Sequence, residues 1–312
     1  MPTVVTSLIE VLDSAYEQMT ADPRSVPEAL APVGAVLYAE YRLRDPQRWK
    51  ETLAACRRHR LGQLLLDDPL TRRSFTQPRG YAGDAELLDI IYAQDWRGIT
   101  PPPSAVGQAI FAHTIACKAP AAVRERRDLL ARKIDEACRR VSSPHILSVA
   151  CGHLRELALA RSYRAGLVGR FVGLDQDALS LAEATRSLPD APVETIPGSI
   201  KLLFGGALAR EQFDFIYTAG LYDYLDEPFA QRLTARLFAM LRPGGRLLVA
   251  NFGEGVQDAG YMEAFMNWTL IYRDEAAMHR LTAGVPVADI GAIQYFADDA
   301  GAVLYLQLER QA

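Results

Sequence analysis

The residues best suited to chemistry form a short turn of small side chains followed by one acid. Ala150-Cys151-Gly152 follows the branched apolar run 146–149, and a second apolar run ends on Asp175, about 20 residues further on. Small residues let backbone N–H groups approach a ligand, and an acid at this distance accepts both hydroxyls of a ribose. The pattern predicts a β-α-β nucleotide site.

The same turn indicates which nucleotide is bound. A dinucleotide site uses three glycines so that a pyrophosphate can sit on a helix N-terminus, but here only Gly152 is glycine, with Ala150 and Leu154 at the flanking positions. No glycine-rich run ends in Lys-Ser or Lys-Thr, so a Walker loop is absent. The turn therefore favours S-adenosylmethionine (SAM) over a dinucleotide.

Two later stretches extend this interpretation. Residues 213–225, FDFIYTAGLYDYL, read as a buried strand with a helix start, and residues 241–252, LRPGGRLLVANF, as a helix stop, a turn and another strand. Over about residues 143 to 310 the chain resembles the class I SAM-dependent methyltransferases. The resemblance implies an α/β, Rossmann-like sheet of seven strands. It also shows a departure: the usual first-strand acid is Ser148, so the contact to the methionyl end of SAM must come from elsewhere.

The resemblance implies where the cofactor is held. Gly198-Ser199-Ile200 lies where this fold usually contacts adenine, although such a turn is equally a plain loop. Residues 219–224 follow the fourth strand, at the edge where ligands bind in open α/β sheets. The expected cofactor-binding residues are Arg79, Ala150, Gly152, His153, Asp175, Gln176, Ser199, Ile200, Thr218, Ala219 and Gly220.

The stretch 77–84, QPRGYAGD, stands apart from the helical patterns around it. Gly80 and Gly83 permit backbone angles that other residues resist, and Asp84 can cap the following helix. One interpretation is a turn and a cap; the other is a lid that holds Arg79 and Tyr81 over the cofactor. Together with NWTLIYR at 267–273, the stretch resembles a bacterial group of SAM enzymes linked to methyl esters of 3-hydroxy fatty acids. That group is similar to the azetidine-2-carboxylate synthases, which keep the fold but cyclise SAM.

A sulfonium cation bound away from water gains about 0.5 to 2 kcal/mol from each well-placed aromatic face. Aromatic residues occur where the pocket is expected, including Tyr224 and Phe252, and the catalytic candidates are Tyr81, Tyr222, Trp268 and Tyr272. The alternative is that Trp268 and Tyr272, four apart on a helix, only pack against the core. Arg79 and Arg273 could hold a carboxylate or form salt bridges. His153 could be a polar contact, a helix start or a base.

Two reactions fit this site. In one, the α-amine of SAM attacks its own γ-carbon and gives azetidine-2-carboxylate and methylthioadenosine, which requires a neutral amine and exclusion of water. In the other, the methyl group passes to a carboxylate or another small acceptor, which needs mainly alignment. Cyclisation is slightly favoured, because aromatic residues suffice to enclose SAM while no apolar tunnel for an acyl chain is evident. A third alternative is a non-catalytic SAM-binding protein, supported only by Ser148.

Composition limits the remaining possibilities. The chain has 312 residues, 49% of them hydrophobic, and a net charge of −4 without a basic face, so we expect no nucleic-acid partner. Four scattered cysteines fit a reducing compartment and no zinc site. Neither a signal peptide nor an apolar run of about 20 residues is found, so we expect a cytoplasmic protein without membrane insertion or metal, acting on a small molecule. Oligomeric state stays open.

The elements that position these residues fall into two expected domains, a helical lid over 1–141 and a SAM-binding domain over 142–312. Helices are expected near 6–19, 27–42, 45–68, 82–94, 104–118 and 120–141. In the second domain, expected strands lie at 146–149, 171–174, 193–196, 213–218, 246–251, 290–296 and 303–309. Expected helices lie at 154–163, 178–187 and 228–240, with a helical insert at 261–281.

Overall fold

The computed structural model describes residues 4–188, 193–206 and 208–312, and the chain divides into two compact units. Unit 1 extends to Val123 and also contains Val256–Thr269, whereas unit 2 consists of Arg124–Gly255 and Leu270–Ala312. Helix α8 (Lys118–Arg140) continues across this division. Contacts therefore divide the chain earlier than Ser142, and the assignment of 1–141 as a lid domain remains a prediction.

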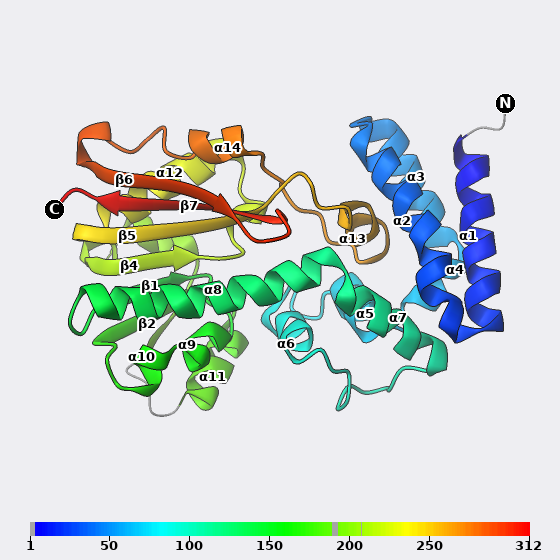
Figure 1. Cartoon of the computed structure of the whole chain (residues 1–312), viewed down its shortest axis with the longest axis horizontal. Coiled ribbons are helices and arrows are strands. Elements are labelled where there is room, and N and C mark those ends of the chain that lie inside the picture. The colour runs from blue at the N-terminus through cyan, green and yellow to red at the C-terminus, as the bar shows by residue number, and fades with distance from the viewer. Residues whose placement is uncertain (1–3, 189–192, 207) are drawn as a thin grey trace. The chain divides into compact units, whose positions relative to one another are not determined.

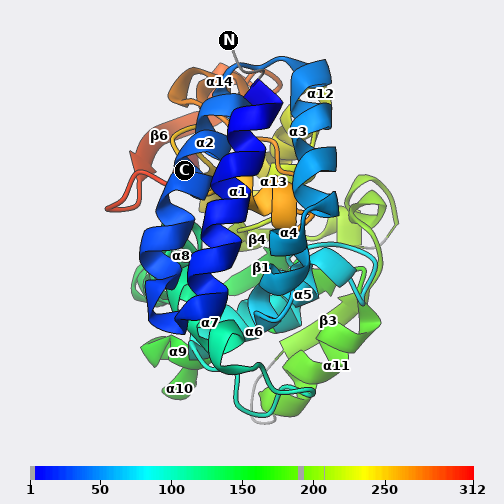
Figure 2. The same cartoon turned by 90° about the vertical axis from the view of Figure 1, so that its right-hand side faces the viewer.

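Unit 1 is helical throughout its described elements. Helices α1 and α2 lie side by side in Figure 2, and their apolar faces share one core that includes Leu12 and Leu37. The helices are α1 (Val4–Ala21), α2 (Val26–Arg42), α3 (Pro46–Arg58), α4 (Arg60–Leu65), α5 (Pro69–Thr76), α6 (Ala85–Ala93), α7 (Ala105–Ala116), the start of α8, and α13 (Ala259–Phe265).

Capping explains most of these helix starts. Asp45 accepts hydrogen bonds from the N–H groups of Gln47 and Arg48. Asp84 accepts one from Leu87, as the sequence predicts. The single helix expected over 45–68 is wrong, because His59 is extended and its Nδ1 accepts the N–H of Leu61 to start a new helix. Helix α5 was not expected.

Unit 2 is built on a seven-stranded sheet in the order β3-β2-β1-β4-β5-β7-β6 (Figure 1). All neighbours are parallel except β7, which runs antiparallel to β5 and β6. This confirms the predicted class I methyltransferase sheet. The strands are β1 (His145–Val149), β2 (Arg170–Asp175), β3 (Val193–Pro197), β4 (Phe213–Thr218), β5 (Leu241–Phe252), β6 (Ile290–Ala297) and β7 (Val303–Arg310).

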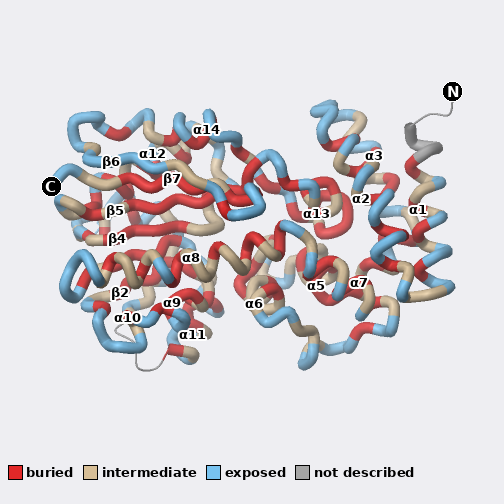
Figure 3. The backbone as a smooth tube through the Cα atoms, in the orientation of Figure 1, coloured by how far each residue is buried: buried red, intermediate tan, exposed pale blue. Residues whose placement is uncertain are grey.

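Helices pack on this sheet in the expected order. The central strands are buried, as Figure 3 shows for β5 and β7, and Leu233 and Leu237 of α12 join the core formed by Leu147, Ile216 and Leu247. The helices of unit 2 are the rest of α8, α9 (Arg155–Leu159), α10 (Arg161–Arg164), α11 (Ala178–Ser187), α12 (Glu227–Ala239) and α14 (Glu275–Arg280). Shorter 3-10 turns include η2 (Ile200–Phe204) and η4 (Tyr222–Tyr224).

Two expected helices are corrected by the backbone. The helix predicted over 154–163 is split into α9 and α10, because Ala160 is extended, with ψ 125°. The helical insert predicted over 261–281 is also interrupted: residues 266–274 lie outside any helix, between α13 and α14. Trp268 and Tyr272 therefore do not share one helix face. The alternative that they pack against the core as neighbours on one helix is wrong.

Candidate functional site

The turn after β1 has an unusual backbone. Ala150, Gly152 and Leu154 all have positive φ, of 54°, 54° and 53°. This left-handed conformation costs a non-glycine residue about 1 to 2 kcal/mol, so Ala150 and Leu154 hold it against their preference. The N–H of Cys151 donates to the carbonyl of Leu174 at 3.2 Å, which ties the turn to the end of β2. Strain of this kind is concentrated at functional sites.

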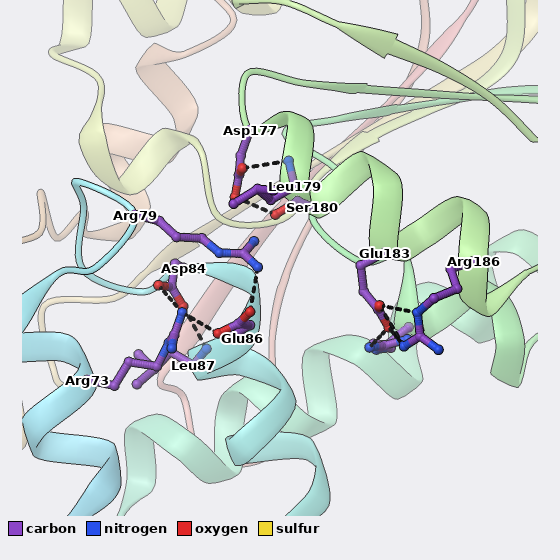
Figure 4. Close-up of polar contacts among 11 residues, drawn as sticks. Arg73, Arg79, Asp84, Glu86, Leu87, Asp177, Leu179, Ser180, Glu183 and Arg186 are labelled. Carbon is purple, nitrogen blue, oxygen red and sulfur yellow. Dashed lines mark hydrogen bonds and ion pairs between the residues drawn. The ribbon is translucent and has the colours of Figure 1, made fainter. Parts of the chain in front are cut away.

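Asp175 closes the same turn from the end of β2. Its side chain is buried, and one carboxylate oxygen accepts the N–H of Gly152 while the other accepts the N–H of Asp177, each at 2.8 Å. Burial raises the pKa of this carboxyl. Each carboxylate oxygen can accept a second hydrogen bond, so the group can still bind ribose hydroxyls. Asp177 in turn caps α11 through Leu179 and Ser180 (Figure 4).

The other expected cofactor residues of unit 2 lie at the carboxyl ends of the strands. Gln176 and Ser199 are exposed, Ile200, Ala219 and Gly220 are half-buried, and His153 is buried in the turn. Thr218, the last residue of β4, is buried, and its hydroxyl has no hydrogen-bond partner among the described residues. A buried hydroxyl without a partner is costly, so a polar ligand at this edge fits the residues present.

A buried polar chain lies beside Ser148, the residue that stands in place of the usual first-strand acid. Ser148 lies opposite Tyr217 in the β1–β4 register, and the Tyr217 hydroxyl donates to Glu156 of α9 at 2.6 Å. Burial raises the pKa of the Glu156 carboxyl and of the Tyr217 hydroxyl. Glu156 was not expected to take part, although it lies four residues after Gly152.

A second buried carboxyl follows β4. Asp223 is 2% exposed, and its Oδ1 accepts the N–H of Phe252 at 2.7 Å. Burial raises its pKa to about 7, against the lowering effect of Arg126 and Arg273. A carboxyl that titrates near neutral pH at a ligand-binding edge is suited to moving a proton. The quoted motif 213–225 contained this residue, and only its burial distinguishes it.

Arg126 is a cation that the sequence did not single out. It is 5% exposed, its guanidinium carbon lies 5.8 Å from the centre of the Phe252 ring, and its Nη1 has no hydrogen-bond partner among the described residues. Nothing in the amphipathic pattern of α8 marks this arginine from its neighbours. Its surroundings depend on how α8 packs on the sheet of unit 2.

The four catalytic candidates belong to different units. Tyr81 and Trp268 lie in unit 1, and Tyr222 and Tyr272 in unit 2. Tyr272 is half-buried, with its ring edge-on to Phe252 at 6.4 Å. Tyr222 does not support the expected role: it is fully buried in the hydrophobic core, and its hydroxyl is 2.9 Å from that of Thr234. Its direction is set by α12 packing, which sequence spacing does not reveal.

The arginines proposed to hold a carboxylate are engaged by protein groups. Arg273 is buried and donates to the carbonyls of Tyr222 and Leu225 and to Asn251, so it binds backbone rather than a ligand. Arg79 forms an ion pair with Glu86 at 2.6 Å, beside the pairing of Arg73 with Asp84 (Figure 4). The salt-bridge alternative therefore describes Arg79, which stays a predicted cofactor residue, whereas Arg273 donates to neutral protein oxygens.

Two motifs that lie far apart in the sequence meet inside unit 1. The Gln77 amide donates to the carbonyl of Asn267 at 3.0 Å, and the Ser74 hydroxyl donates to the carbonyl of Met266 at 2.9 Å. The stretch 77–84 therefore packs on the start of 267–273. The positions of Arg79 and Tyr81 relative to the nucleotide turn remain a prediction.

Within the described residues, no helix is long and apolar enough to cross a membrane. The same part of the chain contains no group of three or more histidine, cysteine or acidic side chains placed to hold a metal ion.

Comparison with known proteins gives one family match and several structural ones. Residues 147–249 match the model of a methyltransferase domain. A possible exported protein from Bordetella parapertussis is 19% identical, with 89% of this chain and 96% of that chain covered and a TM-score of 0.61. The N-methyltransferase NodS from Bradyrhizobium japonicum WM9, solved with S-adenosylhomocysteine, is 16% identical. The match covers 61% of this chain and 88% of that chain, with a TM-score of 0.45. No curated protein matches the chain.

Magnesium protoporphyrin IX methyltransferase from Synechocystis PCC 6803, solved with bound S-adenosylhomocysteine, is 11% identical over 62% of this chain and 87% of that chain, with a TM-score of 0.47. At 19% identity and a TM-score of 0.61, the Bordetella structure shows a shared fold alone. The domain match covers the turn at 150–152, Asp175 and the strands up to β5. It supports a SAM-dependent enzyme of the class I methyltransferase fold, with SAM as cofactor or substrate.

Proposed function

We propose that this enzyme cyclises SAM to azetidine-2-carboxylate and releases methylthioadenosine. The observation that carries this choice is Asp223, a buried carboxyl with a pKa of about 7 after β4, at the edge of the sheet where ligands bind in this fold. Cyclisation requires a group that takes a proton from an ammonium, and a carboxyl near neutrality fits that task. Methyl transfer to a carboxylate requires no such group.

The reaction balances with this one base. The Asp223 carboxylate removes a proton from the α-ammonium of SAM, and the neutral amine then attacks the γ-carbon. A C–N bond forms, the C–S bond breaks, and its electron pair stays on the sulfur of methylthioadenosine. The ring nitrogen keeps two hydrogens as a secondary ammonium, and the proton on Asp223 leaves to solvent. The residues of unit 2 bind and orient SAM, with Asp175 on the ribose.

Tyr81 and Trp268 enter this proposal as the side chains that restrain the methionyl chain while water is excluded. Bulk water would compete with the amine and weaken every charge interaction in the site. Replacement of Tyr81 by alanine is then expected to preserve the fold, because the side chain is only half-buried, and to depress turnover. Full activity of this variant would remove Tyr81 from the mechanism.

The deciding experiment incubates the pure protein with SAM alone and identifies every product by mass spectrometry. Methylthioadenosine together with azetidine-2-carboxylate, above a control without enzyme, supports cyclisation. Methylthioadenosine with homoserine products instead indicates SAM hydrolysis. A mixture that stays inert until a 3-hydroxy fatty acid is added, and then yields S-adenosylhomocysteine and a methyl ester, supports methyl transfer and contradicts cyclisation.

A further inference from the structure

The part of α8 within unit 2 lies along the sheet with its polar side chains on β5, β6 and β7. Lys133 donates to Gln307 of β7 at 2.7 Å and lies over the ring of Phe296, and Arg140 pairs with Glu309 at 2.9 Å. At the other end of this stretch, Arg126 lies over Phe252, the last residue of β5. The helix therefore carries a guanidinium to the carboxyl end of the sheet, where ligands bind in this fold.

Arg126 makes no direct salt bridge with a described residue at this position, although its charge acts on the carboxyls of Glu156 and Asp223. Among the described residues it has no ion pair, and its buried Nη1 has no hydrogen-bond partner. The Tyr305 hydroxyl on β7 is also buried without a partner, and the charge of Arg126 acts on it. A buried charge without a direct partner is unfavourable, as it is when one member of a buried ion pair is removed. The Arg126 guanidinium and the Tyr305 hydroxyl are therefore both donors that an anionic acceptor would satisfy. A carboxylate matches the geometry of a guanidinium.

The carboxyl of Asp223 carries the opposite charge to Arg126 but does not form an ion pair with it. Asp223 is buried and its pKa responds to Arg126, yet the two side chains form no ion pair within 4.0 Å. Its Oδ1 is occupied by the Phe252 N–H, which holds the carboxyl in place. A ligand with a carboxylate and an ammonium on one carbon would satisfy both residues at once.

We propose that Arg126, with Tyr305, binds the α-carboxylate of SAM and that Asp223 binds its α-ammonium. This proposal rests on SAM use by unit 2 and replaces the contact that Ser148 cannot make. It also gives Asp223 the position from which it deprotonates the amine. The assignment holds for either reaction, because the amino-acid end of SAM is the same in both.

The test measures binding of four ligands by calorimetry to the full chain and to Arg126→Gln. S-adenosylhomocysteine and SAM carry the carboxylate, decarboxylated SAM lacks it, and methylthioadenosine lacks the whole amino-acid end. We expect Arg126→Gln to weaken the first two by about tenfold or more and the last two by less than about twofold. Tyr305→Phe should weaken the same two ligands by a smaller factor. Arg126→Lys keeps the charge but not the two-pronged guanidinium geometry, so it should weaken them by an intermediate factor.

Parallel weakening of all four ligands would show a structural role and overturn the proposal, as would unchanged affinity for S-adenosylhomocysteine. If Arg126→Gln binds SAM normally but loses binding of 3-hydroxydecanoate, the carboxylate belongs to an acceptor and the assignment to SAM is wrong. Should Arg126→Gln not fold, the Lys and Tyr305→Phe variants decide by the same selectivity. Because S-adenosylhomocysteine does not turn over, failure of cyclisation leaves this binding test intact. Cyclisation itself is decided separately, by the products of the incubation with SAM alone.

Discussion

Gly83 lies directly against the indole of Trp268. A Cβ atom added at Gly83 would lie 2.4 Å from Cζ2 of that ring and 2.8 Å from Cε2, closer than side chains approach one another. The two residues are far apart in sequence but both belong to unit 1. The glycine of the stretch 77–84 is thus required by the tryptophan of the stretch 267–273, which gives the pairing of these motifs a physical cause.

Gly83→Ala is expected to destabilise unit 1 more than Gly80→Ala does. Both glycines have positive φ, of 67° and 86°, but an added Cβ at Gly80 meets nothing within 4 Å. Each substitution should cost about 1 to 2 kcal/mol for the backbone, and Gly83→Ala about 1 to 3 kcal/mol more for the clash. Urea unfolding of both variants measures the difference. Equal free energies would mean that Trp268 is free to move aside.

Asp175→Ala should weaken SAM and methylthioadenosine alike, by about 1.5 to 3 kcal/mol, since both carry the ribose. The variant also removes the acceptor that holds the Gly152 N–H. Asp177→Asn is the matched control, because asparagine caps α11 as aspartate does and should bind both ligands normally. Calorimetry on the two variants checks this, and unchanged affinity in Asp175→Ala would place the ribose elsewhere.

The rate of methylthioadenosine formation should rise with pH through about 7, because Asp223 must be ionised to accept a proton. Burial raises the pKa of Asp223 above its usual value. At a pH below this raised pKa the carboxyl is protonated and inactive, so the rate increases as the pH rises. Arg126 and Arg273 are the cations that act on Asp223 in the opposite direction. Asp223→Asn should lose about a hundredfold or more in kcat and the rise with pH.

Asp226→Asn controls for the loss of a nearby acid, since Asp226 is exposed and its capping bond to Phe229 can be made by asparagine. Steady-state kinetics between pH 5.5 and 8.5, about 1.5 units on either side of the expected midpoint, provide the measurement. A profile that is the same in Asp223→Asn and the native chain would exclude Asp223 as the base.

Tyr222→Phe should cost stability without abolishing turnover. The hydroxyl of Tyr222 hydrogen-bonds only Thr234 among the described contacts, and Thr234 can still donate to the carbonyl of Ala230 at 2.8 Å. We expect the free energy of unfolding to fall by about 0.5 to 1.5 kcal/mol and kcat to stay near the native value. Thermal unfolding and a SAM-only assay test both points. Loss of activity in a variant of native stability would restore Tyr222 as a catalytic residue.

The sheet of unit 2 was predictable because its signals are local. Buried strands read as continuous apolar runs, and the small residues at 150–152 and the acid at 175 have a fixed spacing along the chain. Helix starts with an aspartate cap were predictable for the same reason. The helix breaks at His59 and Ala160 were not, since each depends on an extended residue that the apolar period does not mark.

The sequence by itself determined the class of fold, the turn after the first strand and the acid at the end of the second, because each is a matter of residue type at short range. Only the tertiary structure decided which polar groups are buried without a partner. Tyr222 proved to belong to the core, while Arg126 and Asp223 came to the edge of the sheet from α8 and from the turn after β4. Burial and the lack of a direct hydrogen-bond partner arise from packing between distant segments, and residue types along the chain do not encode them locally.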